Sequence, residues 1–420
     1  MQNYLIPMIY VSLALVSGIL FPRFELELFP SYVNDVSVNS ALGTLGAIAS
    51  GMMALTAIIF SIAYITVQFS AIAYSPRLAL WFANDPRIFH AMGIFMATFV
   101  YTLWMMAWVD RGGNGRVPLM SSLLVVALLV ASTYVFAMLV KGLSDLQVTN
   151  TLQLIGSKGR AVIAQMYRQL DQPSSDNKNL LDLADDVRTV PVSLSVRYFG
   201  EPRTIAKIDT SKLVQMAEQA DGVIQVTCAV GDTLADDTLI MNVRGGKVPL
   251  SQRKLMQSVL LARQRTFEQD PKYALRLLVD IAIKALSPAI NDPTTAVQAI
   301  DQIEDLLRRL GRHDLDVGYA SDTGGILRVI FPMPTWEDYL RLSFDEIRQF
   351  GANSVQVMRR LRSALIAVAA VASETRAATV QAYIKQLDLG ISRSALDAED
   401  RAIASQEDRQ GLGLSGERAA

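Results

Sequence analysis

The sequence predicts a membrane protein with four N-terminal transmembrane α-helices followed by a soluble α+β domain, in which a small β unit is flanked by helices. Charge distribution carries this prediction. The 420 residues include 39 Lys and Arg and 40 Asp and Glu, but only 11 of these charged residues fall in residues 1–143. The rest of the chain has ordinary charge density and enough length to bury a core.

Four stretches without an ionisable side chain identify the transmembrane helices. They cover residues 1–22, 36–76, 88–109 and 117–140. Each reaches about 20 residues or more, the length that spans a bilayer as a helix. Proline and turn signals at their ends narrow the four helices to about 4–22, 41–74, 88–109 and 118–140. The transmembrane domain is therefore predicted to comprise residues 1–143.

The positive charges on the loops indicate the topology. Four crossings place both termini on the same side of the membrane. The predicted segments on that side carry Arg77, Arg87, Lys141, Lys158 and Arg160, and the opposite segments carry three arginines with four acidic residues. Positive residues are enriched on the cytoplasmic side. We therefore expect an N-in, C-in protein of the bacterial inner (plasma) membrane, with residues 144–390 as a cytoplasmic domain.

The second crossing is unusually long, because residues 36–76 hold no charge over 41 positions. A helix over 41–74 would extend about 51 Å, whereas the hydrocarbon core is about 30 Å thick. Small residues recur every four positions in two rows: Gly43, Ala47 and Gly51, and Gly46, Ser50 and Ala54. Such rows let helix backbones approach closely, so this half is expected to pack against another helix.

The other half of this crossing presents polar side chains on one face, at spacings of three, four and seven residues: Ser61, Tyr64, Gln68 and Ser75. Arg77 follows directly after the helix ends at Pro76. Two interpretations stay open, namely hydrogen bonds to neighbouring helices or a polar pathway around an oligomer axis. In the second, these four residues and Arg77 line the pore, and Arg77 near Arg87 favours anions.

The soluble domain mixes strand and helix patterns. Alternating apolar residues predict strands at 190–198, 223–230, 239–243 and 325–331. Helical periodicity predicts helices at 141–170, 210–219, 249–312 with a break at 287–293, 335–350 and 353–387. After about Gly390 the chain is rich in Ala, Asp, Glu, Arg and Gln. Residues 391–420 are therefore expected to form a polar, frayed tail.

The break at 287–293 is the most distinctive soluble segment. Pro288 helps to end one helix, and Asp292 is placed to cap the next helix, with Pro293 at its first position. One interpretation is a purely structural corner between two helices. The other is a site for a small ligand or ion at the helix N-terminus, with these ligand-binding candidates: Ser287, Asn291, Asp292, Thr294 and Thr295.

Signatures of enzymes are absent from the sequence. There are two histidines, far apart, and one cysteine, and no HExxH, CxxC or GxSxG motif occurs. The segment from Gly156 to Arg160 lacks the spacing of a phosphate-binding loop, and we interpret it as a helix irregularity. A net charge of −1 predicts no nucleic-acid partner. We therefore expect no enzymatic activity, no cofactor and no metal.

Several segments together resemble one family. They are Phe60-Ser61 through Gln68-Phe69-Ser70, Ser75-Pro76-Arg77, the run from Gly93 to Tyr101, Arg265-Thr266 through Gln269-Asp270, and the run from Ala285 to Ala296. This combination resembles the domain-of-unknown-function 2254 family of predicted bacterial membrane proteins, over most of the chain. Two positions depart from the family pattern: Thr294 replaces an aromatic residue, and Tyr198-Phe199-Gly200 replaces a Gly-Tyr pair. The resemblance implies four crossings and a soluble domain, and it implies no activity.

The favoured function is a homo-oligomeric channel or transport-like protein, with the second crossing near the axis and a cytoplasmic gating or assembly domain. Four crossings are too few for a transporter with inverted repeats within one chain, so a pore needs several subunits. The expected partners are the lipid bilayer, further copies of the chain, and small ions or anions. The alternative is a membrane-anchored sensor or scaffold whose soluble domain binds a ligand or a protein.

Overall fold

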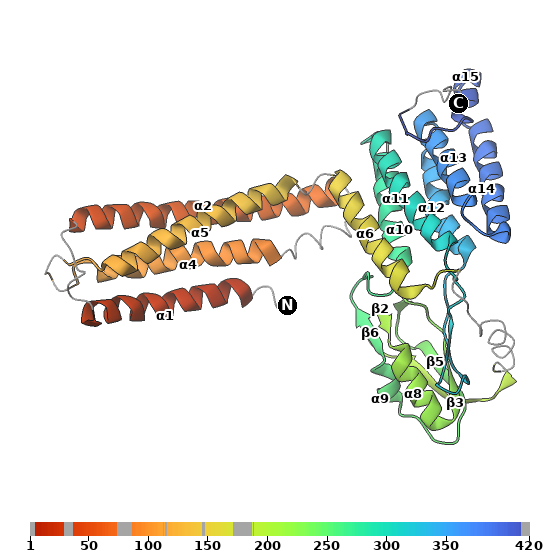
Figure 1. Ribbon diagram of the computed structural model, residues 1–420, viewed down its shortest axis with the longest axis horizontal. Coiled ribbons are helices and arrows are strands. Elements are labelled where there is room, and N and C mark those ends of the chain that lie inside the picture. The colour runs from red at the N-terminus through yellow and green to blue at the C-terminus, as the bar shows by residue number, and fades with distance from the viewer. Residues whose placement is uncertain are drawn as a thin grey trace. The chain divides into compact units, whose positions relative to one another are not determined.

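The computed structural model describes residues 5–28, 37–73, 86–111, 113, 116–144, 148–170, 187 and 189–412. The chain divides into two compact units, residues 1–150 and residues 151–420 (Figure 1). The boundary falls at residue 150, seven residues beyond the predicted end of the transmembrane domain.

Four apolar helices form the first unit, and Figure 1 shows them side by side: α1 (Leu5–Leu28), α2 (Val38–Ala73), α4 (Pro86–Trp108) and α5 (Leu119–Ser144). Each is long and apolar enough to cross a membrane, which confirms the predicted class. α2 is one continuous helix of 36 residues, not two short ones. α1 continues six residues past Pro22, where the sequence placed its end, and these residues carry a buried carboxylate.

That carboxylate is Glu25, which caps the start of α5 from within α1. It is almost fully buried. Its oxygens accept from Met120 N at 2.6 Å, from Ser121 N at 2.8 Å and from Ser121 Oγ at 2.6 Å. The first N–H groups of any helix lack partners inside the helix, so Glu25 satisfies donors that would otherwise face an apolar surrounding. A residue that the sequence assigned to a loop therefore joins two transmembrane helices.

Glu25→Ala is expected to lower the free energy of unfolding by about 1–2 kcal/mol, the usual cost of losing a helix cap. Glu27→Ala is the matched control, because Glu27 lies on the same helix and, among the described residues, forms an exposed ion pair with Arg23 alone. Such pairs contribute about 0–1 kcal/mol. Thermal unfolding in detergent measures both variants. Equal midpoints for the two variants would contradict the capping role.

α4 lies at the centre of the membrane unit and packs against α1, α2 and α5. Half of its membrane-spanning window is buried, against 11% for α5. Between α4 and α5 the fully buried hydroxyls of Thr98 and Ser132 lie 3.0 Å apart. Most of the surface of α5 and α1, and one whole side of α2, therefore faces outward from this unit.

The second unit contains two β-sheets. A five-stranded sheet has the order β1-β5-β3-β8-β7, and a three-stranded sheet has the order β4-β2-β6. Neighbouring strands are antiparallel except β3 and β8, which are parallel. The strands are β1 (Val192–Tyr198), β2 (Arg203–Ile208), β3 (Gly222–Val226), β4 (Thr233–Leu234), β5 (Thr238–Gly245), β6 (Val259–Ala262), β7 (Tyr319–Ser321) and β8 (Leu327–Ile330).

The remaining helices of this unit divide between the sheets and a helical layer (Figure 1). α8 (Thr210–Ala220) and α9 (Gln252–Met256) lie with the strands. The helical layer contains α6 (Val148–Met166), α10 (Pro271–Ala285), α11 (Pro293–Gly311), α12 (Trp336–Phe350), α13 (Val355–Ala369), α14 (Glu374–Ser392) and α15 (Ala398–Ala404). Thr335 caps α12 in a capping box with Asp338.

Two of the predicted soluble helices are wrong in part. Residues 249–270 form the short helix α9, the strand β6 and a loop, because Val259 to Ala262 pair with β2. A short apolar run fits a strand or a helix equally well, and only the distant partner decides. Residues 353–387 do not form a single helix, because a turn at 370–373 separates α13 from α14.

The predicted frayed tail is packed as far as residue 412. α14 continues to Ser392, and α15 follows it. Three α13 side chains then bind the main chain of the next segment: Gln356 donates to Gly411 O at 2.5 Å, Arg359 donates to Glu407 O at 3.1 Å, and Ser363 Oγ accepts from Asp408 N at 2.9 Å. Composition could not reveal these partners, which lie about 50 residues away in sequence.

A charged cluster holds β8 to the end of α8. The guanidinium of Arg328, which is buried, donates to Asp322 at 2.7 Å and to Asp221 at 3.3 Å. Asp322 also accepts from the backbone N–H groups of Gly324 and Ile326. The hydrogen bond from Arg328 and those backbone donors hold the pKa of Asp322 below its usual value.

Stability is therefore expected to fall under acidic conditions. Because the folded pKa of Asp322 lies below the unfolded value of about 3.9, its contribution is complete above that pH. It is lost as the pH falls through the lower, folded value. Unfolding midpoints measured between neutral pH and about pH 3 should drop less steeply for Asp322→Asn than for the wild-type protein. Parallel curves would exclude this role.

Candidate functional site

α2 packs inside its own chain through one regular row of side chains. Residues of this row recur at alternating spacings of four and three, and all but Ala63 are buried: Leu45, Ala49, Met52, Thr56, Ile59, Ala63 and Thr66. Spacing of this kind is the mark of a coiled-coil seam, in which side chains interlock with the facing helix. We call this row the inner seam.

A second row with the same spacing runs along the opposite side of α2. All eight of its residues are exposed, and six of them are small: Gly43, Ala47, Ser50, Ala54, Ala57, Ser61, Tyr64 and Gln68. We call this row the outer seam. Gly43 and Gly51, which flanks the row, have no other atom within 4 Å of the position a Cβ would occupy. The small rows predicted for close packing therefore contact few of the described residues.

Three of the five predicted pore-lining residues lie together on the outer seam. Ser61 donates to the carbonyl of Ala57 in its own helix at 3.1 Å. Tyr64 is 66% exposed, and Gln68 is exposed. None of the three bonds to another helix among the described residues. Ser75 and Arg77 lie outside the described residues.

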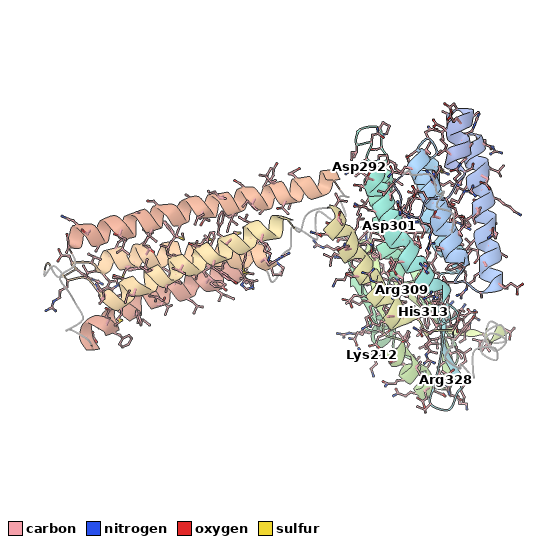
Figure 2. All side chains as sticks on the ribbon, turned by 45° about the horizontal axis from the view of Figure 1, so that its top comes forward. Lys212, Asp292, Asp301, Arg309, His313 and Arg328 are labelled. Carbon is pink, nitrogen blue, oxygen red and sulfur yellow. The ribbon has the colours of Figure 1, made fainter. Side chains whose placement is uncertain are left out.

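The predicted ligand residues at 287–295 form the corner between α10 and α11. Figure 2 shows Asp292 at the start of α11, with Arg309 toward its end. The carboxylate of Asp292 accepts from Thr295 N at 3.1 Å and from Thr295 Oγ1 at 2.5 Å. The Ser287 carbonyl accepts from Asn291 N, and Asn291 adopts a left-handed conformation with φ of 48°. Thr294 is exposed.

These hydrogen bonds support the interpretation in which Asp292 caps α11 and the corner is structural. Both carboxylate oxygens of Asp292 accept hydrogen bonds within the corner itself. None of the five predicted ligand residues lines the cavity at Trp336 or the cavity at Asp270. A ligand at this point would have to compete with Thr295 for Asp292. The pattern Asn-Asp-Pro therefore acts as a stop and restart signal between two helices.

The segment from Arg265 to Asp270 joins the helical layer to the three-stranded sheet. The side-chain amide of Gln269 accepts from Ile208 N at 2.9 Å and donates to Ile208 O at 3.3 Å, so it pairs with β2 as a neighbouring strand would. Asp270 is 1% exposed, and one of its oxygens pairs with Arg265 at 3.3 Å. Burial raises the pKa of Asp270 against the opposing charges of Arg265 and Lys272.

Asp270 retains an unsatisfied oxygen. Its Oδ1 has no hydrogen-bond partner among the described residues. The other oxygen, Oδ2, lies close to the backbone of Gly231, whose φ is +90°. A Cβ at position 231 would lie 2.5 Å from Oδ2, so a side chain there would clash. Buried polar atoms are nearly always hydrogen-bonded, so an orphaned carboxylate oxygen marks this position as a candidate site. The sequence interpretation did not single out Asp270, although it noted the segment.

Two cavities lie on either side of the loop from Phe331 to Pro334. One has a volume of about 620 Å³ and is lined also by Trp336 and Arg376. Arg376 Nη1 donates to the carbonyls of Leu310, Gly311 and His313, so it closes the end of α11. The other cavity has a volume of about 240 Å³ and is lined by Gln269 and Asp270.

Catalytic and metal chemistry have few candidates in the described part of the chain. No group of three or more His, Cys, Asp or Glu side chains there could hold a metal ion. The single cysteine, Cys228, is buried, and its thiol donates to Leu239 O at 3.2 Å. Burial raises the pKa of this thiol, which lowers its reactivity.

Comparison with known proteins agrees with this architecture. The model of a family described as "Predicted membrane protein (DUF2254)" matches residues 2–367. The chain is 24% identical over 415 residues to the uncharacterised proteins Mb1321c of Mycobacterium bovis and Rv1290c of Mycobacterium tuberculosis, covering 95% of this chain and 78% of each relative. No solved structure matches. The chain, with its four apolar helices and its domain of two sheets and helices, belongs to the DUF2254 family of predicted membrane proteins.

Proposed function

We propose that the chain forms a homo-oligomeric channel or transport-like protein of the bacterial inner membrane, with α2 of each copy near the axis. The observation that supports this proposal most strongly is the outer seam. Its residues repeat with the spacing of a coiled coil, yet all eight are exposed in the single chain. A row of this kind is complementary to another copy of itself, because small residues allow close approach of helix backbones.

The two halves of the outer seam suit two roles in such an assembly. From Gly43 to Ala57 its residues are Gly, Ala and Ser, which permit contact between copies. Tyr64 and Gln68 continue the same face with larger polar groups, which can line a passage for small ions. In the proposal Ser75 and Arg77, which lie outside the described residues, complete the pore lining, and Arg77 gives a preference for anions.

The cytoplasmic domain serves as the gate or assembly part in this proposal. Three residues separate the end of α5 from the start of α6, so the connection between the membrane helices and the second unit is short in sequence. The N-in, C-in topology places the domain in the cytoplasm, in keeping with the positive charges on that side. The proposal assigns the chain no enzymatic activity, in keeping with the lack of catalytic motifs in the sequence.

Oxidative cross-linking in native membranes tests the contact between copies. In a protein carrying Cys228→Ala, the variant Ala54→Cys places a thiol on the outer seam, whereas Val130→Cys places one on the exposed side of α5. The first is expected to give a covalent dimer, and the second is not. Absence of the dimer for Ala54→Cys, or equal dimer from both variants, counts against the seam as the interface.

Current recording from purified protein in planar bilayers tests the passage. Gln68→Leu is expected to change the conductance several-fold, because it removes the polar group at the end of the seam that is proposed to line the passage. Thr133→Val on α5 is the control, since that hydroxyl binds only its own helix. A monomer by native mass spectrometry together with no conductance would refute the channel.

A further inference from the structure

The cavity of about 240 Å³ lies where several elements of the second unit meet. It is lined from the end of α6, the start of α8, the turn at 229–230, the start of α10 and the loop at 331–334. Most of its walls are apolar, with Met166, Val230, Phe331 and Met333 among them. Apolar walls with a few polar groups are typical of small-molecule sites.

Two charged residues of opposite sign stand two positions apart on this wall. Asp270 is 1% exposed, and its Oδ1 lacks a hydrogen-bond partner among the described residues. Lys272 forms no salt bridge with a described residue, although its charge acts on the carboxylates of Asp270 and Asp338. Arg265 pairs directly with Asp270, so the ammonium of Lys272 remains available to a ligand. The cavity wall therefore offers Asp270 as an acceptor for a hydrogen-bond donor and Lys272 as a positive charge for an acidic group.

The backbone reinforces the preference for an acid group. Thr210 is the first residue of α8, and Pro271 and Lys272 open α10. Asp209 uses its side chain to cap α8, but the side chain of Asp270 makes no cap hydrogen bond to α10. Helix N-termini carry partial positive charge and unpaired N–H groups. Both termini border the same cavity and favour a carboxylate through this partial charge, although Pro271 has no N–H and Tyr273 N already bonds to Asp270 O.

From this constellation we infer that the cavity binds a small amino acid with an apolar side chain. Its carboxylate pairs with Lys272 near the two helix N-termini, its ammonium donates to the carboxylate of Asp270, and its side chain packs against Val230, Phe331 and Met333. The site is independent of the proposed role of α2.

Titration calorimetry on the full-length protein in detergent tests the inference with three probes of nearly equal shape. Leucine carries both charged groups, 4-methylpentanoate lacks the amine, and 3-methylbutylamine lacks the acid. Leucine is expected to bind about tenfold more tightly than either analogue, which corresponds to about 1.4 kcal/mol for each charged group. Equal affinity for leucine and an analogue would overturn the assignment of that group, and no binding at millimolar concentration would overturn the site.

Variants connect the binding to this cavity. Lys272→Gln is expected to weaken leucine about tenfold, and Val230→Trp is expected to abolish binding by filling the space. Lys284→Gln is the matched control, because Lys284 lies on the last turn of the same helix and does not line the cavity. Wild-type affinity in Lys272→Gln would place the ligand elsewhere. Thermal unfolding of each variant verifies that it folds.

Discussion

Replacing Gly159 with leucine is expected to separate α6 from α10 and α11 and to destabilise the second unit by about 3 kcal/mol or more. A Cβ at position 159 would lie 2.9 Å from both Ala274 Cβ and Leu306 Cδ1, which are side chains of α10 and α11. Both neighbours are fully buried, so they cannot move aside without disturbing the core. Denaturant unfolding of the full-length protein measures the loss.

Ser157→Leu provides the matched control for this experiment. Ser157 lies on the same helix but is exposed, and its hydroxyl bonds only to Leu154 O at 2.8 Å. The same side chain added there is expected to change stability by less than about 0.5 kcal/mol. If both leucines destabilise equally, the cause is the loss of helix quality and not the close contact.

Removing residues 405–420 is expected to lower the free energy of unfolding by about 3–5 kcal/mol. The deletion takes away the Glu407 carbonyl from Arg359, which is fully buried, and a hydrogen bond to a charged group contributes about 1.5–3 kcal/mol. It also removes the neutral bonds of Gln356 and Ser363, about 0.5–1.5 kcal/mol each. Thermal and denaturant unfolding of the full-length and shortened proteins give the difference.

A shorter deletion distinguishes these contacts from a general effect of the terminus. Removing only residues 413–420 keeps every contact of the described tail and is expected to leave stability within about 0.5 kcal/mol. Arg359→Lys keeps the charge but offers fewer donors, so it should fall between the two. A wild-type midpoint for the longer deletion would show that the tail contributes nothing.

The sequence predicted the membrane unit far better than the soluble unit, for a physical reason. A transmembrane helix is encoded locally, because a long apolar run without charge can satisfy its own backbone hydrogen bonds in the membrane by forming a helix. The strands β2, β4, β6 and β7 were missed because each is short and acquires its identity from a distant partner. The N-cap at Asp292 was found because its signal lies within a few neighbouring residues.

The functional surfaces divide in the same way. The polar face of α2 was visible in sequence, and the inner seam shows why its residues point outward. The alternating spacing from Gly43 to Gln68 was not recognised in the sequence. It joins small residues and polar residues into a single seam. The glycines of α6 were interpreted as an irregularity, yet they lie within a regular helix and allow close packing. A Gly-x-x-Gly pair in an amphipathic helix was the available signal.

The two seams of α2 have a consequence for the handedness of any assembly. Both repeat at about 3.5 residues per turn, whereas a straight α-helix has about 3.6. Contacts on both sides can persist along the helix only if it winds left-handed around its neighbours. Helices of the same chain and helices of other copies would thus both wind left-handed around α2. A single residue inserted in the middle of α2 would turn its second half by about 100° and break both sets of contacts together.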